Sequence, residues 1–203
     1  MPATVVLGAQ WGDEGKGKMV DQLASEAQWV ARFQGGNNAG HTIVIGDTTL
    51  KLNHLPSGIT YPDCNLVLGD GMVIDPWTLE KELDDWFEIK NERPEGTRLW
   101  ISERAHVNLP FHRRIDGTDT KIGTTKRGIG PTYGDKIERV GVRFCDIPSR
   151  MADSDWLEYT AERMNARLER YGIKDTSPSA EDPVGWKTPS LQKSLHGEIT
   201  PQK

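Results

Sequence analysis

A glycine-rich loop carrying two lysines directly follows an apolar run near the start of this 203-residue chain. The run over residues 4–8, TVVLG, is typical of a buried strand, and the residues after Lys18 have helical character. Between them lies GDEGKGK, residues 12–18. Glycines let a backbone approach an anion closely, and lysines at a helix N-terminus add positive charge. The order strand, loop and helix therefore predicts an α/β protein with a phosphate-binding loop.

This loop departs from an ordinary P-loop at Met19. It satisfies G-x-x-x-x-G-K from Gly12 to Lys18, but a P-loop continues with Ser or Thr, whose hydroxyl ligates magnesium. The nearest hard oxygen ligand is instead the carboxylate of Asp13. Because a carboxylate among phosphates is costly unless a metal ion or a proton lies between them, we expect Asp13 to take part in the chemistry. The alternative is a plain strand-to-helix turn whose glycines only permit a tight bend.

Size, charge and cysteine content limit the possible functions. The length suits one sizeable core, and 35% hydrophobic with 27% charged residues is typical of soluble globular proteins. The sequence contains no apolar run long enough to cross a bilayer and no export signal at its start, which predicts a cytoplasmic protein without a membrane partner. A net charge of −5 argues against nucleic acid as the main partner. Cys64 and Cys145 are far apart in sequence, which favours reduced thiols over a zinc site or a disulfide.

Basic residues concentrate in one segment of this acidic chain. Residues 104–143 hold nine Lys and Arg against four Asp and Glu. Such a segment suits a small phosphorylated ligand, and a solvated loop is the alternative.

Apolar runs alternate with turn residues through the first half of the chain. Strands are predicted at 4–8, 29–34, 65–68 and 99–102, a hairpin at 42–45 with 49–53, and helices at 16–27 and from Pro76 to about Lys90. This alternation predicts a largely parallel sheet with flanking helices, and ligands of such sheets gather at the carboxyl ends of the strands.

The second half is predicted to be less regular. Residues 116–134 are polar and rich in glycine and are expected to form a long loop, and residues 154–171 have the spacing of an amphipathic helix. Residues 1–172 should then form one nucleotide-binding α/β domain. Residues 173–203 hold four prolines and no sustained period, so we expect an irregular or disordered tail.

A second small-residue loop, QGGNNAGHT at residues 34–42, follows the second predicted strand. It should therefore emerge at the same sheet edge as the first loop. Gly40 can bring its carbonyl close to a cation, Asn38 offers an amide, and His41 can donate a proton to a phosphoryl group. A lone histidine on a loop is more often a surface or hydrogen-bonding residue, and that alternative stays open for His41.

Three segments together resemble the adenylosuccinate synthetase family. They are QWGDEGKGK at 10–18, QGGNNAGHT at 34–42 and IGTTKRGIGP at 122–131, and residues 54–58 and 141–143 add to them. The resemblance implies a ligase of purine biosynthesis that joins IMP and L-aspartate at the expense of GTP. The expected product, adenylosuccinate, would form through a 6-phosphoryl-IMP intermediate.

The resemblance also implies roles for particular residues. Asp13 would be the base at N1 of IMP and, with the carbonyl of Gly40, a ligand of Mg²⁺, and His41 would be the acid beside the phosphoryl group. A retained Asp13 also favours IMP over the 2-amino purine that viral relatives use. The residues expected to bind GTP are Gly12, Asp13, Glu14, Gly15, Lys16, Gly17, Lys18, Gly40, His41 and Thr42. Those expected to bind IMP are Asp13, Glu14, Gly15, Lys16, Asn38, Ala39, Gly40, His41, Thr125 and, in the neighbouring subunit of a homodimer, Arg139.

Two departures leave alternatives open. Lys126 replaces the glycine usual in its loop, and Glu14 is as readily a packing charge as a ligand.

The resemblance covers the N-terminal part of the family, from residue 3 to Ile147, and the guanine- and aspartate-recognising segments of its later part are not visible. One hypothesis is a synthetase competent only when completed by further polypeptide. The other is a truncated, non-catalytic nucleotide- or phosphate-binding module, while an unrelated P-loop kinase or GTPase is disfavoured by Met19 and by the lack of an N-K-x-D sequence.

Overall fold

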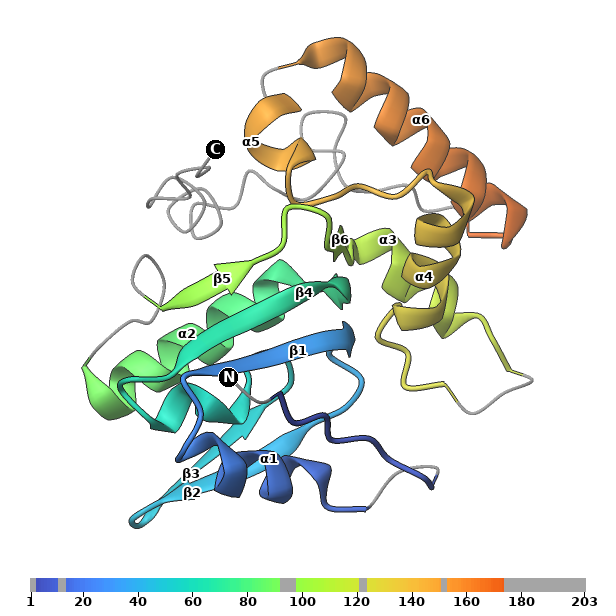
Figure 1. Ribbon diagram of the computed structural model, residues 1–203. Coiled ribbons are helices and arrows are strands. Elements are labelled where there is room, and N and C mark those ends of the chain that lie inside the picture. The colour runs from blue at the N-terminus through green and yellow to red at the C-terminus, as the bar shows by residue number, and fades with distance from the viewer. Residues whose placement is uncertain (1–2, 11–13, 92–97, 121–123, 151–152, 174–203) are drawn as a thin grey trace.

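A parallel sheet flanked by helices forms the framework of the protein (Figure 1). The computed structural model describes residues 3–10, 14–91, 98–120, 124–150 and 153–173. Strands lie in the order β1 (Trp29–Gly35), β4 (Asn65–Ile74) and β5 (Leu99–Ile101), and β6 (His106–Val107) pairs with the end of β4. All these pairs are parallel, which confirms the predicted α/β class.

The remaining elements surround this sheet. The hairpin of β2 (His41–Ile45) and β3 (Thr48–Leu52) turns at Gly46, as predicted. The helices are α1 (Lys16–Ala24), the 3₁₀ turn η1 (Ser57–Thr60), α2 (Pro76–Lys90), α3 (Pro110–Gly117), α4 (Ile129–Glu138), α5 (Asp146–Arg150) and α6 (Ser154–Arg170). The predictions of helices in α1, α2 and α6 are confirmed, although α1 ends at Ala24, before the expected residue 27.

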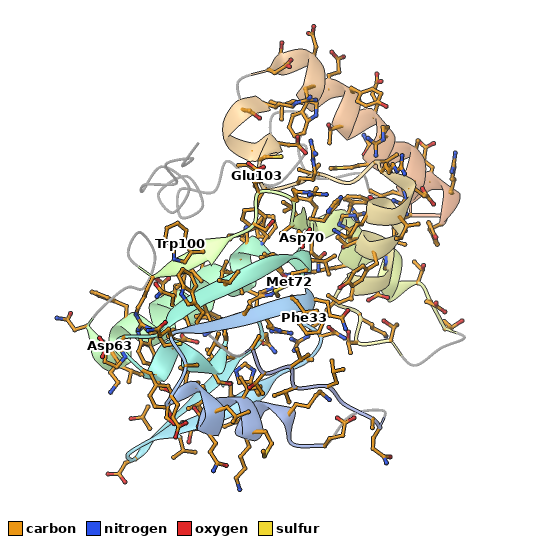
Figure 2. The ribbon with its side chains drawn as sticks, viewed as in Figure 1. Phe33, Asp63, Asp70, Met72, Trp100 and Glu103 are labelled. Atoms are coloured by element: carbon orange, nitrogen blue, oxygen red, sulfur yellow. The ribbon has the colours of Figure 1, made fainter. Side chains whose placement is uncertain are left out.

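The two faces of the sheet differ in burial. Leu66 and Leu68 of β4 are fully buried in the core. Residues of opposite parity point to the other face, where Trp29, Phe33 and Trp100 are 52%, 50% and 43% exposed. Phe33 and Trp100 come from the strands on either side of β4 (Figure 2). Parallel sheets are usually covered on both faces. Aromatic side chains as exposed as these are therefore unusual on a parallel sheet.

The prediction of a strand at residues 4–8 is wrong. The structure describes this segment without strand pairing, and Val5 and Leu7 are 68% and 70% exposed. Strand propensity produces a strand only when a neighbouring edge supplies hydrogen bonds and a packed face, and this segment has neither among the described residues. The glycine-rich loop therefore follows an extended segment rather than a sheet strand.

The fourth strand is longer than predicted. The sequence places its end at Leu68, before Gly69-Asp70-Gly71, but β4 continues to Ile74. A Cβ on Gly71 would lie 2.2 Å from the carbonyl oxygen of Phe33, where the register with β1 shifts. Glycine is needed at this close approach of two strands, so it marks a bulge and not a turn.

The predicted loop at 116–134 is wrong at both ends. Helix α3 continues to Gly117, and α4 begins at Ile129, leaving only a short connection between them. The buried positions of α4 are Thr132 and Asp135, so the helix lacks the apolar period by which sequence patterns reveal a helix.

Helix α6 closes the described part of the chain. Met164 and Leu168 pack in the core, and Arg167 forms an ion pair with the buried Asp135 of α4. Just after the helix, Gly172 has a φ of 71°, and the N–H of Ile173 donates to the carbonyl of Leu168 (3.0 Å). The predicted tail from residue 173 lies, after Ile173, outside the described residues. In the part of the chain that the structure describes, no helix combines the length and apolar character needed to traverse a bilayer.

Candidate active site

The first loop leads into α1 through a left-handed glycine. Gly15 is the N-cap of α1 with φ of 77°, a conformation that favours glycine. Lys16 and Lys18, in the first turn, are exposed to solvent. The free N–H groups and the positive helix end therefore face outward with two ammonium groups beside them, as the sequence predicts. The predictions for Gly12 and Asp13 concern residues outside the described part of the chain.

Glu14 folds back within this loop. Its carboxylate pairs with Lys16 and accepts a hydrogen bond from the backbone N–H of Gln10 (2.9 Å). The pairing with Lys16 lowers the pKa of Glu14 to about 2, so the carboxylate is charged at neutral pH. The ion pair lies close to the backbone of Gly8, where a Cβ would be 2.6 Å from both charged groups. In the ligand-free protein Glu14 thus neutralises one of the two lysines.

The two predicted loops meet, although residues 4–8 are not in the sheet. Gly17 of α1 packs against His41 at the start of β2, and a Cβ on Gly17 would lie 2.8 Å from that of His41. The hydroxyl of Ser57 donates to the carbonyl of Gly17 (3.4 Å), so η1 holds the same helical turn. The expected meeting of the two loops is therefore seen for Gly17 and His41, but not at a shared edge of the parallel sheet, because residues 4–8 form no strand and His41 lies in the β2–β3 hairpin.

His41 is neutral in this setting. Burial, and then the charge of Arg32, lowers its pKa to about 4. Its Nε2 atom is buried and has no hydrogen-bond partner among the described residues. A neutral imidazole with one unsatisfied ring nitrogen is suited to hydrogen-bond a ligand placed between the two loops.

The second loop has a buried base and an exposed tip. The Asn37 side chain is 2% exposed and donates to Asp75 Oδ2 (2.7 Å), whereas Asn38, Ala39 and Gly40 are exposed. Asn38, Ala39 and Gly40, which the sequence predicts to contact ligands, are therefore exposed to solvent. Asn37, the residue before them, is held in place by Asp75.

The side chain of Asp116 holds a third loop, residues 124–128, by two hydrogen bonds. This carboxylate accepts from the Thr124 hydroxyl (2.7 Å) and from the backbone N–H of Gly128 (2.8 Å). Asn108 donates to the carbonyl of Arg127 (2.6 Å), and Arg127 in turn donates to the carbonyl of Asn37. The second and third loops are thus joined, with Thr125 exposed at the tip.

Sequence reasoning missed the carboxylates that support these loops. Asp75 and Asp116 are buried, and their partners are distant in sequence. An aspartate directly before Pro76 signals a helix N-cap, but no local pattern shows which loop it also contacts.

Arg139 stands apart from the loops. It is exposed and caps the C-terminal end of α4 with φ of 59°, while Thr125 precedes the other end. A helix of this length separates them by about 15 Å. Within one chain Arg139 therefore lies at the opposite end of α4 from Thr125.

Oxygen atoms of the glycine-rich loops are the expected metal ligands. The described residues contain no group of three His, Cys, Asp or Glu side chains arranged to hold a metal ion. A site made by the Asp13 carboxylate and the Gly40 carbonyl would offer hard oxygens, which suit Mg²⁺. Gly40 is exposed at the loop tip and thus open to an ion.

One pocket lies between α3, α4 and α6. Its lining includes Phe111, His112, Val142 and Arg163, and none of the residues that the sequence assigns to ligands. Side chains of α6 form its wall, so the pocket is a packing feature of that helix.

The fold and these loops define an α/β protein whose glycine-rich loops converge beside a parallel sheet. The chain matches the family model for adenylosuccinate synthetase over residues 5–191. The matched region extends past α6 into residues 174–191, which lie outside the described residues. The chain therefore belongs to the adenylosuccinate synthetase family.

Individual relatives agree. Adenylosuccinate synthetase of a Nostoc species is 47% identical over 195 residues, covering 92% of this chain and 43% of the relative. That of Clostridium botulinum is 50% identical over 171 residues, covering 81% of this chain and 40% of the relative. The chain thus spans less than half the length of these curated relatives.

Two solved structures share the fold. Fully ligated adenylosuccinate synthetase from Plasmodium falciparum has a TM-score of 0.73 and 36% identity, covering 88% of this chain and 42% of that one. Succinoaminodeoxyadenylate synthetase of cyanophage S-2L, bound to dGMP and dATP, has a TM-score of 0.54 and 32% identity, covering 64% and 36%.

Proposed function

We propose that this chain supplies the nucleotide-binding part of a GTP-dependent adenylosuccinate synthetase, acting on IMP and L-aspartate in purine biosynthesis. The observation that carries the proposal is the meeting of Gly17 with His41, because it brings the N-terminal turn of α1 next to the loop of Asn38 and Gly40. The membership of the family supports the same conclusion.

The proposed reaction has two steps. The carboxylate of Asp13 removes the N1 proton of IMP, and the O6 atom that gains the charge attacks the γ-phosphorus of GTP, releasing GDP. The amino group of L-aspartate then attacks C6 and displaces phosphate. His41 would hydrogen-bond the phosphoryl group during transfer, and its neutral state in the ligand-free protein suits a donor that does not carry a permanent charge.

The proposed ligand contacts follow from the three loops. The α1 loop, residues 12–18, and residues 40–42 would hold the phosphates of GTP. Glu14, Gly15, Lys16, Asn38, Ala39 and Thr125 would contact IMP. Because Lys16 pairs with Glu14 when no ligand is present, binding of a phosphate would draw its ammonium group away from that carboxylate.

Asp13 and Gly40 would hold Mg²⁺, which supplies positive charge beside the transferring phosphoryl group. Arg139 is exposed and distant from Thr125 in its own chain, which supports a role at the IMP of a neighbouring subunit in a homodimer. Such a dimer would function in the cytoplasm.

IMP is favoured over the deoxyguanylate-type ligand of the cyanophage protein. Asp13 is the expected base for an N1 proton, and this chain is more similar to the Plasmodium falciparum enzyme than to the phage enzyme. The second candidate function is a nucleotide-binding module without turnover. The exposed apolar face of Trp29, Phe33 and Trp100 favours that candidate for the chain in isolation, because a synthetase would have this face covered.

A complementation assay tests the proposal. The chain is incubated with GTP, Mg²⁺, IMP and L-aspartate, alone and with the part of the Nostoc relative that lies beyond the matched region. We expect adenylosuccinate only from the mixture, and none when the chain carries Asp13→Asn. Product from the chain alone would show that no completion is needed. No product from the mixture, despite binding of IMP and GTP, would favour the binding module.

A further inference from the structure

A buried aspartate at the end of β4 contacts the second loop and the helices α2 and α3. Asp75 has no exposed surface and directly follows Ile74, at the carboxyl edge of the sheet. Its Oδ2 accepts from Asn37 Nδ2 (2.7 Å) and pairs with the guanidinium of Arg113 on α3. Its Oδ1 accepts from the backbone N–H of Thr78 (3.2 Å) and thereby caps α2.

Asn37 receives contacts from two directions. Its side chain is held by Asp75, and its backbone carbonyl accepts from Arg127 of the third loop. The residue after it, Asn38, begins the exposed tip. The Asn37 amide also donates to the hydroxyl of Thr78 (3.2 Å), which itself donates to Asp75 Oδ2 (2.9 Å), so both ends of Asn37 are held at the base of the tip.

The charges around Asp75 explain why a carboxylate is suited to this position. Arg113 and Arg127 lie close enough that the charge of Arg127 lowers the pKa of Arg113, after the larger effect of burial. A neutral residue at position 75 would leave these two guanidinium groups to repel each other across the base of the loops. Asp75 thus draws α3, and through Asn37 the third loop, toward the end of β4.

A helix cap alone does not account for these contacts. Asp153 caps α6 in the same way, with its side chain accepting from the backbone N–H of Trp156 (3.1 Å), but within the described residues it makes no hydrogen bond to a loop of the site. The Asp75 carboxylate is buried, and its bonds to Asn37 and Arg113 extend beyond α2.

We infer that Asp75 is a positioning residue for the substrate nucleotide, which fixes the second and third loops through Asn37 and Arg113 so that Asn38 and Thr125 face one ligand together. The inference rests on the proposed function for the identity of the ligand, IMP. The positioning itself concerns the ligand-free protein.

Serine separates the two roles of this residue. Serine is a good N-cap, but its side chain is too short to reach both Asn37 and Arg113 while capping α2. Asp75→Ser should therefore keep the helix and release the loops. Asn37→Ala removes the same contact from the other side and serves if Asp75→Ser does not fold. Asp153→Ser is the matched control, because it makes the same change at a cap outside the site.

Two measurements test the inference. Without ligand, backbone NMR order parameters of residues 36–40 should fall from about 0.85 to below about 0.6 in Asp75→Ser and Asn37→Ala, and stay unchanged in Asp153→Ser. By calorimetry, both site variants should weaken IMP binding about tenfold, with GTP affinity changed less than about threefold.

Rigid loops in Asp75→Ser and Asn37→Ala would overturn the inference, as would equal losses of IMP and GTP affinity. If the unmodified chain does not bind IMP, the proposed function fails instead, and the order parameters still decide the role of Asp75.

Discussion

Gly17 and His41 touch across the two glycine-rich loops, with no space for a side chain on the glycine. A Cβ at Gly17 would lie 2.8 Å from the Cβ of His41 and 3.4 Å from its Cγ. The first turn of α1 therefore rests directly on the residue that begins β2. Under the proposed function, this contact would set how closely a phosphate at α1 approaches the imidazole.

Gly17→Ala should disrupt nucleotide binding by separating the loops. The added methyl group would force His41 or the helix to move, which costs about 1–3 kcal/mol in a packed site. We expect a lower Tm and loss of most GTP affinity, measured by thermal unfolding and calorimetry. Gly134→Ala is the control. Gly134 lies in α4, where an added Cβ would meet no neighbouring atom within 4 Å, so this substitution should raise stability by about 0.5–1 kcal/mol. Unchanged GTP affinity in Gly17→Ala would contradict the role of this contact.

The buried histidines should titrate far below the ordinary histidine value. Burial lowers the pKa of His41 from 6.5 to about 4 and those of His54 and His112 to about 3. Because the unfolded chain binds these protons first, the folded state should lose stability as pH falls from 6.5 toward 4. Histidine ring NMR signals recorded from pH 7 to 3.5 would test this. A midpoint near 6.5 for His41 would show that its surroundings are more polar than described.

One glutamate of α2 should be essential for stability. Buried Glu82 accepts from the backbone N–H groups of Asn53, His54 and Leu55 at 2.7–3.0 Å. Glu82→Ala would leave these donors unsatisfied and should cost about 3 kcal/mol or more in the free energy of unfolding. Lys81→Ala removes only an exposed ion pair with Asp85 on the same helix, and should change stability by less than about 1 kcal/mol in urea unfolding. Equal effects of the two substitutions would refute this account.

The open face of the sheet should behave as an apolar surface in the isolated chain. The rings of Trp29 and Trp100 lie 6.3 Å apart on this face, and both are about half exposed. Trp29→Ser with Trp100→Ser should reduce binding of a hydrophobic dye such as ANS and weaken complementation by further polypeptide. Tyr159→Ser, which removes an exposed aromatic ring of α6, should change neither. Unchanged dye binding in the double variant would show that this face is covered in solution.

Much of the fold could be predicted because its signals are local. The capped start of α2 at Pro76, the hairpin turn at Gly46 and the apolar period of α6 each lie within a short window of sequence. These features depend on propensity and periodicity, which a sequence displays directly. The two loops do meet at Gly17 and His41, but the reason expected from the sequence, two strands of one sheet ending at the same edge, does not hold for residues 4–8.

The errors arise where distant residues decide the outcome. Gly71 resembles a turn residue until Phe33 is seen beside it, and α4 lacks an apolar stripe because Asp135 satisfies His112 and Arg167 instead. Residues 4–8 have strand propensity, but their environment among the described residues offers no partner. The contact of Asp75 with Asn37 joins positions 38 residues apart, and no local pattern signals it.

Ligand-induced stabilisation of the purified chain tests the central claim most directly. Thermal unfolding is followed with IMP, with GTP and Mg²⁺, and with both, for the unmodified chain and for Asn38→Ala. At a ligand concentration of a hundred times Kd, we expect each nucleotide to raise the Tm by about 5–10 °C, and Asn38→Ala to reduce the shift caused by IMP. An unmodified chain whose Tm is unaffected by either nucleotide would contradict the claim that these loops form a nucleotide-binding site.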